Sequence, residues 1–314
     1  MNIRKQYGKR INVRKKPWLR FVSSLLPAVA LLLLQGSCAE RPLDVRPTEG
    51  HVVIHASWNS ATPPTSGLRF YFYPQGGDST ALSYDGSPTG FEGDLPAGEY
   101  RVIACSTDAR NVAYQDMESY SSASITATAD AQGRSLSYYA QPSGVYVLKL
   151  SDLTVPLQDT VETSSVPDTL SSGMNLSFLL LGSESPASLS GLIRGIQPSV
   201  FIATGQSWGE TGATSFTTVV SGNEATAEIG MLGILDPLGS LPYRNLMDLT
   251  LTLNDGTVQT TQVDLTQFLS DVLNANGGSV PVELSVEVEL RLIDAQLVAS
   301  VKPWNDGSGE GSVK

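Results

Sequence analysis

The segment Leu284-Ser-Val-Glu-Val-Glu-Leu-Arg-Leu292 carries the most regular pattern in the chain. Apolar side chains occupy every second position, with serine, glutamate and arginine between them. Successive side chains of a β-strand point to opposite faces, so this period of two predicts a strand with one buried and one solvated face. Leu297–Val301 follows closely and is expected to pair with it.

The same alternation recurs elsewhere in the chain. Leucine alternates with threonine in Leu249–Leu253, and Asn254-Asp255-Gly256 predicts a hairpin turn into Thr257–Val263. Short strands separated by Gly, Pro, Ser and Asp indicate an all-β chain of the β-sandwich type. The other expected strands are His51–Trp58, Leu68–Tyr73, Glu99–Cys105, Ala123–Thr128, Val145–Leu150, Asn175–Leu181, Ser199–Thr204 and Thr214–Ser221.

One short helix is expected near the C-terminal end. Asp264 can cap its start, and Gly277-Gly278 should end it. Between them, five apolar residues recur at the spacing of one helix face, namely Leu265, Phe268, Leu269, Val272 and Leu273.

The N-terminus has the pattern of a secretory signal. Residues 1–20 hold eight basic residues and no acid, and the apolar run Phe21–Leu34 has 14 residues. A membrane-spanning helix needs about 20, so the run is too short to cross a bilayer. Gly36-Ser37 precedes Cys38, and this junction resembles the lipobox of bacterial lipoproteins, although Gln35 replaces the usual aliphatic residue. We expect lipid on Cys38. The alternatives are an ordinary signal peptide, with Cys38 incidental, and an uncleaved anchor.

Composition then divides the remaining chain. Polar, proline-bearing residues after Cys38 are expected to form a tether, and the polar Pro, Ser and Thr stretch between Ser151 and Ser172 indicates a domain boundary. The expected parts are a signal peptide 1–37, a tether 38–49, an N-terminal sandwich 50–160, a linker 161–173, a C-terminal sandwich 174–304 and a flexible tail 305–314.

The net charge of the chain argues against nucleic acid as a partner. Removing residues 1–37 takes eight of the 20 Lys and Arg and none of the 31 Asp and Glu, which leaves 12 against 31, a net charge of −19. Such a surface repels phosphate backbones, so nucleic-acid binding is not expected. With Cys38 lipidated, Cys105 is the last thiol, and its apolar surroundings in the sequence predict an inert core cysteine.

Several motifs together resemble the fimbrillin-like lipoproteins of Bacteroides-type bacteria. They are the lipobox, the first strand His51–Trp58, Tyr73-Pro74, Leu95-Pro-Ala-Gly-Glu-Tyr-Arg-Val-Ile103 and the closing Val301-Lys-Pro-Trp304. The resemblance implies two tandem transthyretin-like, Greek-key β-sandwiches. It also implies a function in fimbrial assembly, in which a subunit cut after an arginine accepts a strand from its neighbour.

Within that family, two features favour an anchor or accessory subunit. Arg41 and Arg46 both precede proline, and an Arg-Pro bond is a poor protease substrate. The tail 305–314 offers only Val313 as an apolar side chain, which is too little for a donor strand. We therefore expect an outer-membrane lipoprotein that binds other fimbrial subunits and supports adhesion. The alternative is a stand-alone surface module that binds glycan or protein.

No catalytic site, metal or cofactor is expected. His51 and His55 would lie roughly 13 Å apart on one strand face, too far to share a metal. Gly205-Gln-Ser207-Trp-Gly209 matches a nucleophile elbow, but both histidines precede it and a Gly/Thr-rich loop follows. Glu287 and Glu289 have a spacing compatible with a glycosidase pair, but they alternate with buried valines and indicate a solvated face.

Two kinds of surface site remain. Trp208 lies in a polar loop and could stack on a sugar or a partner, or fold back onto the core. Ser79, Thr160 and Thr169 each follow an aspartate, in a short pattern that O-glycosylation uses in exported Bacteroides-type proteins. The sequence does not identify a small-molecule ligand.

Overall fold

The computed structural model describes residues 48–59, 62–76, 80–130, 137–182, 185–234, 244–278, 280–294 and 296–303. Residues 48–314 form one compact unit. The predicted signal peptide, most of the predicted tether, Trp304 and the predicted tail 305–314 lie outside the described residues.

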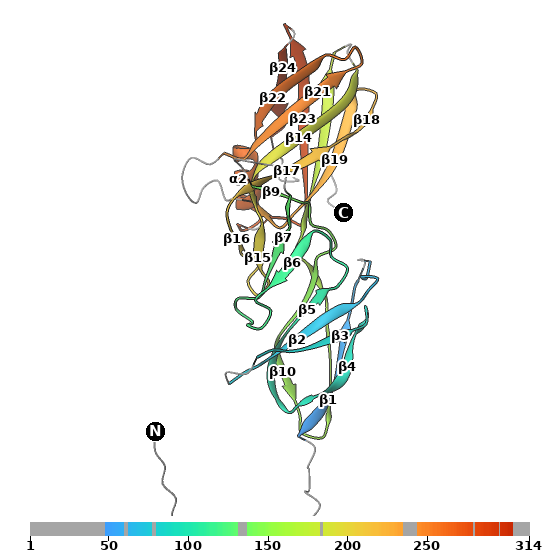
Figure 1. Ribbon diagram of the computed structural model, residues 1–314, viewed down its shortest axis with the longest axis vertical. Helices are drawn as coiled ribbons and strands as arrows, with labels where there is room; N and C mark the ends of the chain where they lie inside the picture. Colours follow the sequence, from blue (N-terminus) through green and yellow to red (C-terminus); the bar gives the residue numbers. More distant parts are fainter. Residues whose placement is uncertain are drawn as a thin grey trace, which may run out of the picture. The chain divides into compact units, whose positions relative to one another are not determined.

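The N-terminal half contains two facing sheets (Figure 1). Its main strands are β1 Glu49–Ala56, β2 Leu68–Pro74, β3 Leu82–Gly86, β4 Gly90–Pro96, β5 Gly98–Ser106, β10 Tyr146–Val155, β11 Thr160–Ser165 and β12 Asp168–Thr169. The first sheet has the order β11-β1-β4, and the second has the order β12-β10-β5-β2-β3. Side chains of both sheets meet in one core, which includes Ile54, Leu95, Phe72 and Leu148.

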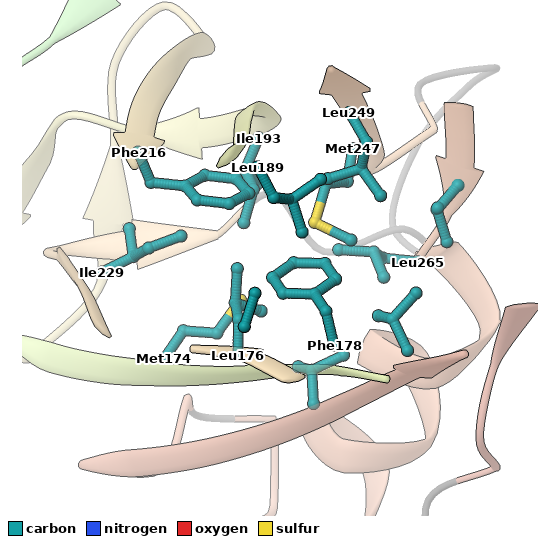
Figure 2. Packing of buried hydrophobic residues seen from close by; sticks show 14 of the residues in the cluster. Met174, Leu176, Phe178, Leu189, Ile193, Phe216, Ile229, Met247, Leu249 and Leu265 are labelled. Carbon is teal, nitrogen blue, oxygen red and sulfur yellow. The ribbon is translucent and has the colours of Figure 1, made fainter. Parts of the chain in front are cut away.

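The C-terminal half repeats this two-layer arrangement. Its strands are β13 Ser172–Leu181, β14 Pro186–Gln197, β17 Gly212–Thr217, β18 Val219–Ser221, β19 Glu224–Met231, β20 Gly233–Ile234, β21 Leu246–Leu253, β22 Val258–Asp264, β23 Glu283–Ile293 and β24 Gln296–Val301. One sheet runs β18-β19-β13-β23-β24, and the other contains β22-β21-β14-β17. Figure 2 shows Phe178 of β13 pointing toward Leu189 of β14 and Met247 of β21 in the core between the sheets.

The predicted all-β sandwich fold with a short C-terminal helix is confirmed. The apolar residues Leu284, Val286, Val288 and Leu290 of β23 are buried, and β24 pairs with β23 antiparallel. Helix α2 spans Thr266–Ala275, and the Asp264 carboxylate accepts a hydrogen bond of 2.9 Å from the Thr266 N–H at its start. Gly277 and Gly278 have positive φ after its end, as the expected stop requires.

A further sheet joins segments from the two halves of the sequence. Its strands are β6 Val112–Gln115, β7 Ser124–Ala127, β15 Ser199–Phe201 and β16 Ser207–Trp208, in the order β16-β15-β7-β6. Two short strands, β8 Ala129–Asp130 and β9 Tyr138–Tyr139, extend the C-terminal sheet through β17. A separate core beneath these strands packs Ile103 and Ile125 against Val200 and Ile202.

The expected linker 161–173 is instead paired backbone. It contains most of β11, all of β12 and the start of β13. β11 pairs in parallel with β1, from His51↔Thr160 to Ala56↔Ser165. The side chains of β11 are Thr, Val, Glu and Ser, a polar composition typical of loops. The segment is nevertheless a strand because its backbone pairs with that of β1.

Candidate functional site

Strand β1, which follows the tether, is the centre of the candidate site. It lies between β4, antiparallel, and β11, parallel. Val52, Ile54 and Ala56 point into the core. At its start, a Cβ on Gly50 would lie 1.9 Å from the Pro156 carbonyl oxygen, so only glycine fits there. β1 is therefore held by backbone pairing with both neighbouring strands and by the burial of its inward side chains in the core.

The outward face of β1 carries both histidines of the chain. His51 Nδ1 lies 2.7 Å from Asp94 Oδ1, and its Nε2 lies 3.6 Å from Glu92 Oε1, both on β4. His55 Nε2 lies 2.8 Å from Glu162 Oε1 on β11. The hydrogen bond to Asp94 raises the pKa of His51 above its ordinary value. These pairs connect β1 to both neighbouring strands.

From the raised pKa of His51, we predict a pH dependence of stability. Because the pKa of His51 is raised in the folded state, its contribution is fully present below pH 6.5, the ordinary value, and is lost as pH rises through the folded pKa. We expect the melting temperature to fall slightly between pH 5.5 and pH 8. His51→Gln should reduce this fall. Thermal unfolding followed by circular dichroism measures it, and an unchanged slope in the variant would contradict the assignment.

The turn between β4 and β5 closes the tether end of the N-terminal sandwich. Tyr100 is buried, and its hydroxyl donates a hydrogen bond of 2.8 Å to the Pro96 carbonyl. The Ala97 N–H donates to the Thr48 carbonyl at 2.8 Å. The Leu-Pro-Ala-Gly-Glu-Tyr motif thus holds the backbone where β1 begins.

Trp208 lies in the edge strand β16 and is 37% exposed. Its ring stacks on Phe201 of β15, with centroids 5.3 Å apart and an interplanar angle of 16°. Gly205 and Gly209 on either side have positive φ and turn the chain into and out of this strand. Trp208 therefore packs partly on the sheet and presents part of its surface to solvent.

The serine and the two glutamates considered as catalytic residues are bound to neighbouring side chains. The Ser207 hydroxyl donates to Gln197 Oε1, and a strand follows Gly209 where an elbow needs a helix. Glu287 binds Lys302 at 2.7 Å, and Glu289 binds Arg291 at 3.2 Å.

Cys105 is buried, as predicted, and burial raises the pKa of its thiol. A raised thiol pKa keeps the sulfur protonated and unreactive. Among the described residues, no group of three His, Cys, Asp or Glu could hold a metal ion.

The predicted lipidation and O-glycosylation sites do not form a cluster among the described residues. Thr160 is exposed at the start of β11, and Thr169 is half-buried in β12. Cys38 and Ser79 lie outside the described residues. Within the part of the chain that the structure describes, no helix is long and apolar enough to cross a membrane.

Sequence reasoning missed the partners of the histidines and of Trp208. Asp94, Glu162 and Phe201 are ordinary residues in the sequence. The strand register and the β15–β16 pairing bring them into contact, so no local signal pointed to them.

Comparison with known proteins bears on the family. Residues 37–169 match a family described as a domain of unknown function (DUF5119). Over 137 residues, the chain is 27% identical to a Bacteroides ovatus protein that carries the name of a fimbrium anchoring subunit, Fim4B. The resemblance to fimbrillin-like proteins is confirmed. The match covers 42% of this chain and 40% of the length of that relative.

Solved structures share the fold. A crystal structure from Bacteroides ovatus, described as an adhesin, aligns with a TM-score of 0.54 and 20% identity over 71% of this chain and 84% of its own. Another, from Bacteroides thetaiotaomicron and also described as an adhesin, has a TM-score of 0.50 and 14% identity over 82% and 97% of the two chains. At this identity the likeness concerns the fold.

Proposed function

We propose that the chain is an outer-membrane lipoprotein, held by lipid on Cys38, that serves as an anchor or accessory subunit of a surface fimbria. In this role it supports adhesion and binds other fimbrial subunits through strand addition. The observation that carries the proposal is the sequence similarity, over 137 residues, to a protein named as a fimbrium anchoring subunit.

The positions of the arginines support an anchor rather than a released subunit. Arg41 and Arg46 precede proline, and the next arginine is Arg69 in β2. The backbone of Arg69 pairs with Asp85 on one side and Cys105 on the other, so a protease cannot bind it as an extended chain. Arginine-specific cleavage should therefore leave the lipid attached to β1.

This argument predicts how a protease will act on the lipidated protein. An arginine-specific protease should leave residues 38–68 of the folded protein attached. Pro47→Ala should open the Arg46 bond and move most of the protein from the membrane to the soluble fraction. Pro42→Ala makes the bond after Arg41 cleavable in the same way, and it should also move the protein to the soluble fraction. N-terminal sequencing of fimbria-associated protein is the measurement. A natural terminus between residues 47 and 70, with no lipidated form, would make the chain a released subunit.

A second candidate function is a stand-alone module that binds a surface glycan. The partly exposed Trp208, stacked on Phe201, is the observation that favours it, because aromatic rings offer a flat apolar surface for stacking.

Trp208→Ala tests this second function. If Trp208 contacts the ligand, binding to an array of plant and mucin glycans should be lost while the protein stays folded. Tyr84→Ala is the matched control, since Tyr84 is 38% exposed on β3. Binding that survives Trp208→Ala, or falls equally in both variants, would remove Trp208 as a ligand contact.

A further inference from the structure

An open groove of about 580 Å³ lies on the outer face of the C-terminal sheet β18-β19-β13-β23-β24. This volume falls within the range of about 300–1,000 Å³ that is usual for ligand sites. Residues of five strands, β13, β17, β18, β19 and β23, line it, including Asn175, Ser177, Val219, Thr226, Glu228 and Glu287. The groove is far in sequence from β1 and does not depend on the fimbrial role proposed above.

Strand register arranges the groove in two rows. Asn175 of β13 lies between Glu228 of β19 and Ser285 of β23. The next row places Ser177 between Thr226 and Glu287. Outward side chains repeat about every 6.6 Å along each strand, which is also the repeat of an extended peptide. The small, hydrogen-bonding floor can therefore accept a chain that runs along the strands.

The outer face of this sheet is negatively charged. Five glutamates of β19 and β23 point outward or lie half-buried on it, namely Glu224, Glu228, Glu283, Glu287 and Glu289. Arg291 and Lys302 are already paired with Glu289 and Glu287. Among the described residues, Glu228 in the groove has no salt-bridge partner. A cation from a partner would complement it.

One rim of the groove is apolar and open. Val219 is 75% exposed, the highest value among the large apolar side chains described. It lies beside Thr226 in the strand pairing, one strand from the floor of the groove. A lysine side chain has an apolar stem and a charged head, so its stem can cover Val219 while its ammonium group reaches Glu228.

We infer that this groove docks an extended, lysine-bearing segment of a protein partner. Its lining residues include no aromatic ring, which disfavours sugar stacking there, and no metal-binding trio occurs among the described residues. The acidic rim, the hydroxyl and amide floor and the exposed valine together match a basic peptide in the extended conformation.

Fluorescence polarisation with the lipidated protein in neutral detergent tests this inference. The probe is a labelled octapeptide of alternating lysine and serine, at near-physiological salt to screen distant charges. Glu228→Gln should weaken binding about two- to fivefold, the upper part of the range of one exposed ion pair. Glu224→Gln, which removes an equal charge from the same strand outside the groove, should change it by less than about twofold. Ser177→Trp, which fills the groove, should abolish binding.

Three outcomes would overturn the inference. They are no binding of the peptide to the wild-type protein, equal weakening by both glutamate variants, and unchanged binding by Ser177→Trp. If Ser177→Trp alters the circular dichroism spectrum, Thr226→Arg replaces it, since it adds a cation at an exposed floor position. An octapeptide of alternating glutamate and serine should not bind.

Discussion

Cys38→Ala is expected to move the protein from the membrane fraction to the soluble fraction, or to leave an unprocessed precursor. Acyl chains bind a bilayer with about 0.8 kcal/mol for each buried CH₂ group, and two or more chains give stable attachment. Without them, a mature chain of net charge −19 offers no electrostatic attraction to anionic lipid. Cell fractionation combined with labelling by radioactive palmitate measures both effects.

The second cysteine provides the matched control. Cys105 is enclosed in the core, and Cys105→Ala should leave attachment and palmitate labelling unchanged. If Cys38→Ala still carries label and stays with membranes, Cys38 is not the lipidated residue. If both variants lose attachment, the loss reflects misfolding rather than missing lipid.

Ile54→Asp is expected to unfold the N-terminal sandwich and to prevent incorporation into fimbriae. Ile54 is 1% exposed in β1, within the core that contains Phe70 and Phe91. A carboxyl group there would be buried without a partner, at a cost of about 3–5 kcal/mol, which is a large share of the stability of an ordinary domain. Denaturant unfolding and the amount of the protein in purified fimbriae are the measurements.

Val53→Thr on the opposite face of the same strand is the control. Val53 lies between Glu92 and Glu162 in the strand register and is only half-buried. Threonine keeps the β-branched shape and the strand preference, so stability should change by about 0.5 kcal/mol or less. If Ile54→Asp retained full stability and assembly, β1 would not be an essential part of the sandwich.

Local sequence patterns were sufficient to predict the position of a strand wherever that strand had one clear apolar face. β23, β24, the Asp255-Gly256 turn and helix α2 lie close to their predicted positions, because alternation, turn residues and helix periodicity are properties of neighbouring residues. The buried state of Cys105 followed from its apolar neighbours in the same way.

Other strands gave no such signal. β14 carries Gly191 against the Phe216 ring, where a Cβ would lie 2.4 Å from Cζ, and Gly195 at a positive φ interrupts the alternation. These glycines serve contacts between strands, but in the sequence they resemble loop residues. β11 is similarly polar and depends on its pairing with β1.

The sequence alone was enough to identify an acidic, all-β chain and to predict a lipoprotein-type signal, because composition, charge and periodicity can be read from neighbouring residues. It could not place Glu162 beside His55, Phe201 beneath Trp208, or Ile125 beside Val200. Those contacts depend on which strands pair and in what register. Strand pairing is a long-range choice, settled by the packing of both sheets at once and not by any single segment.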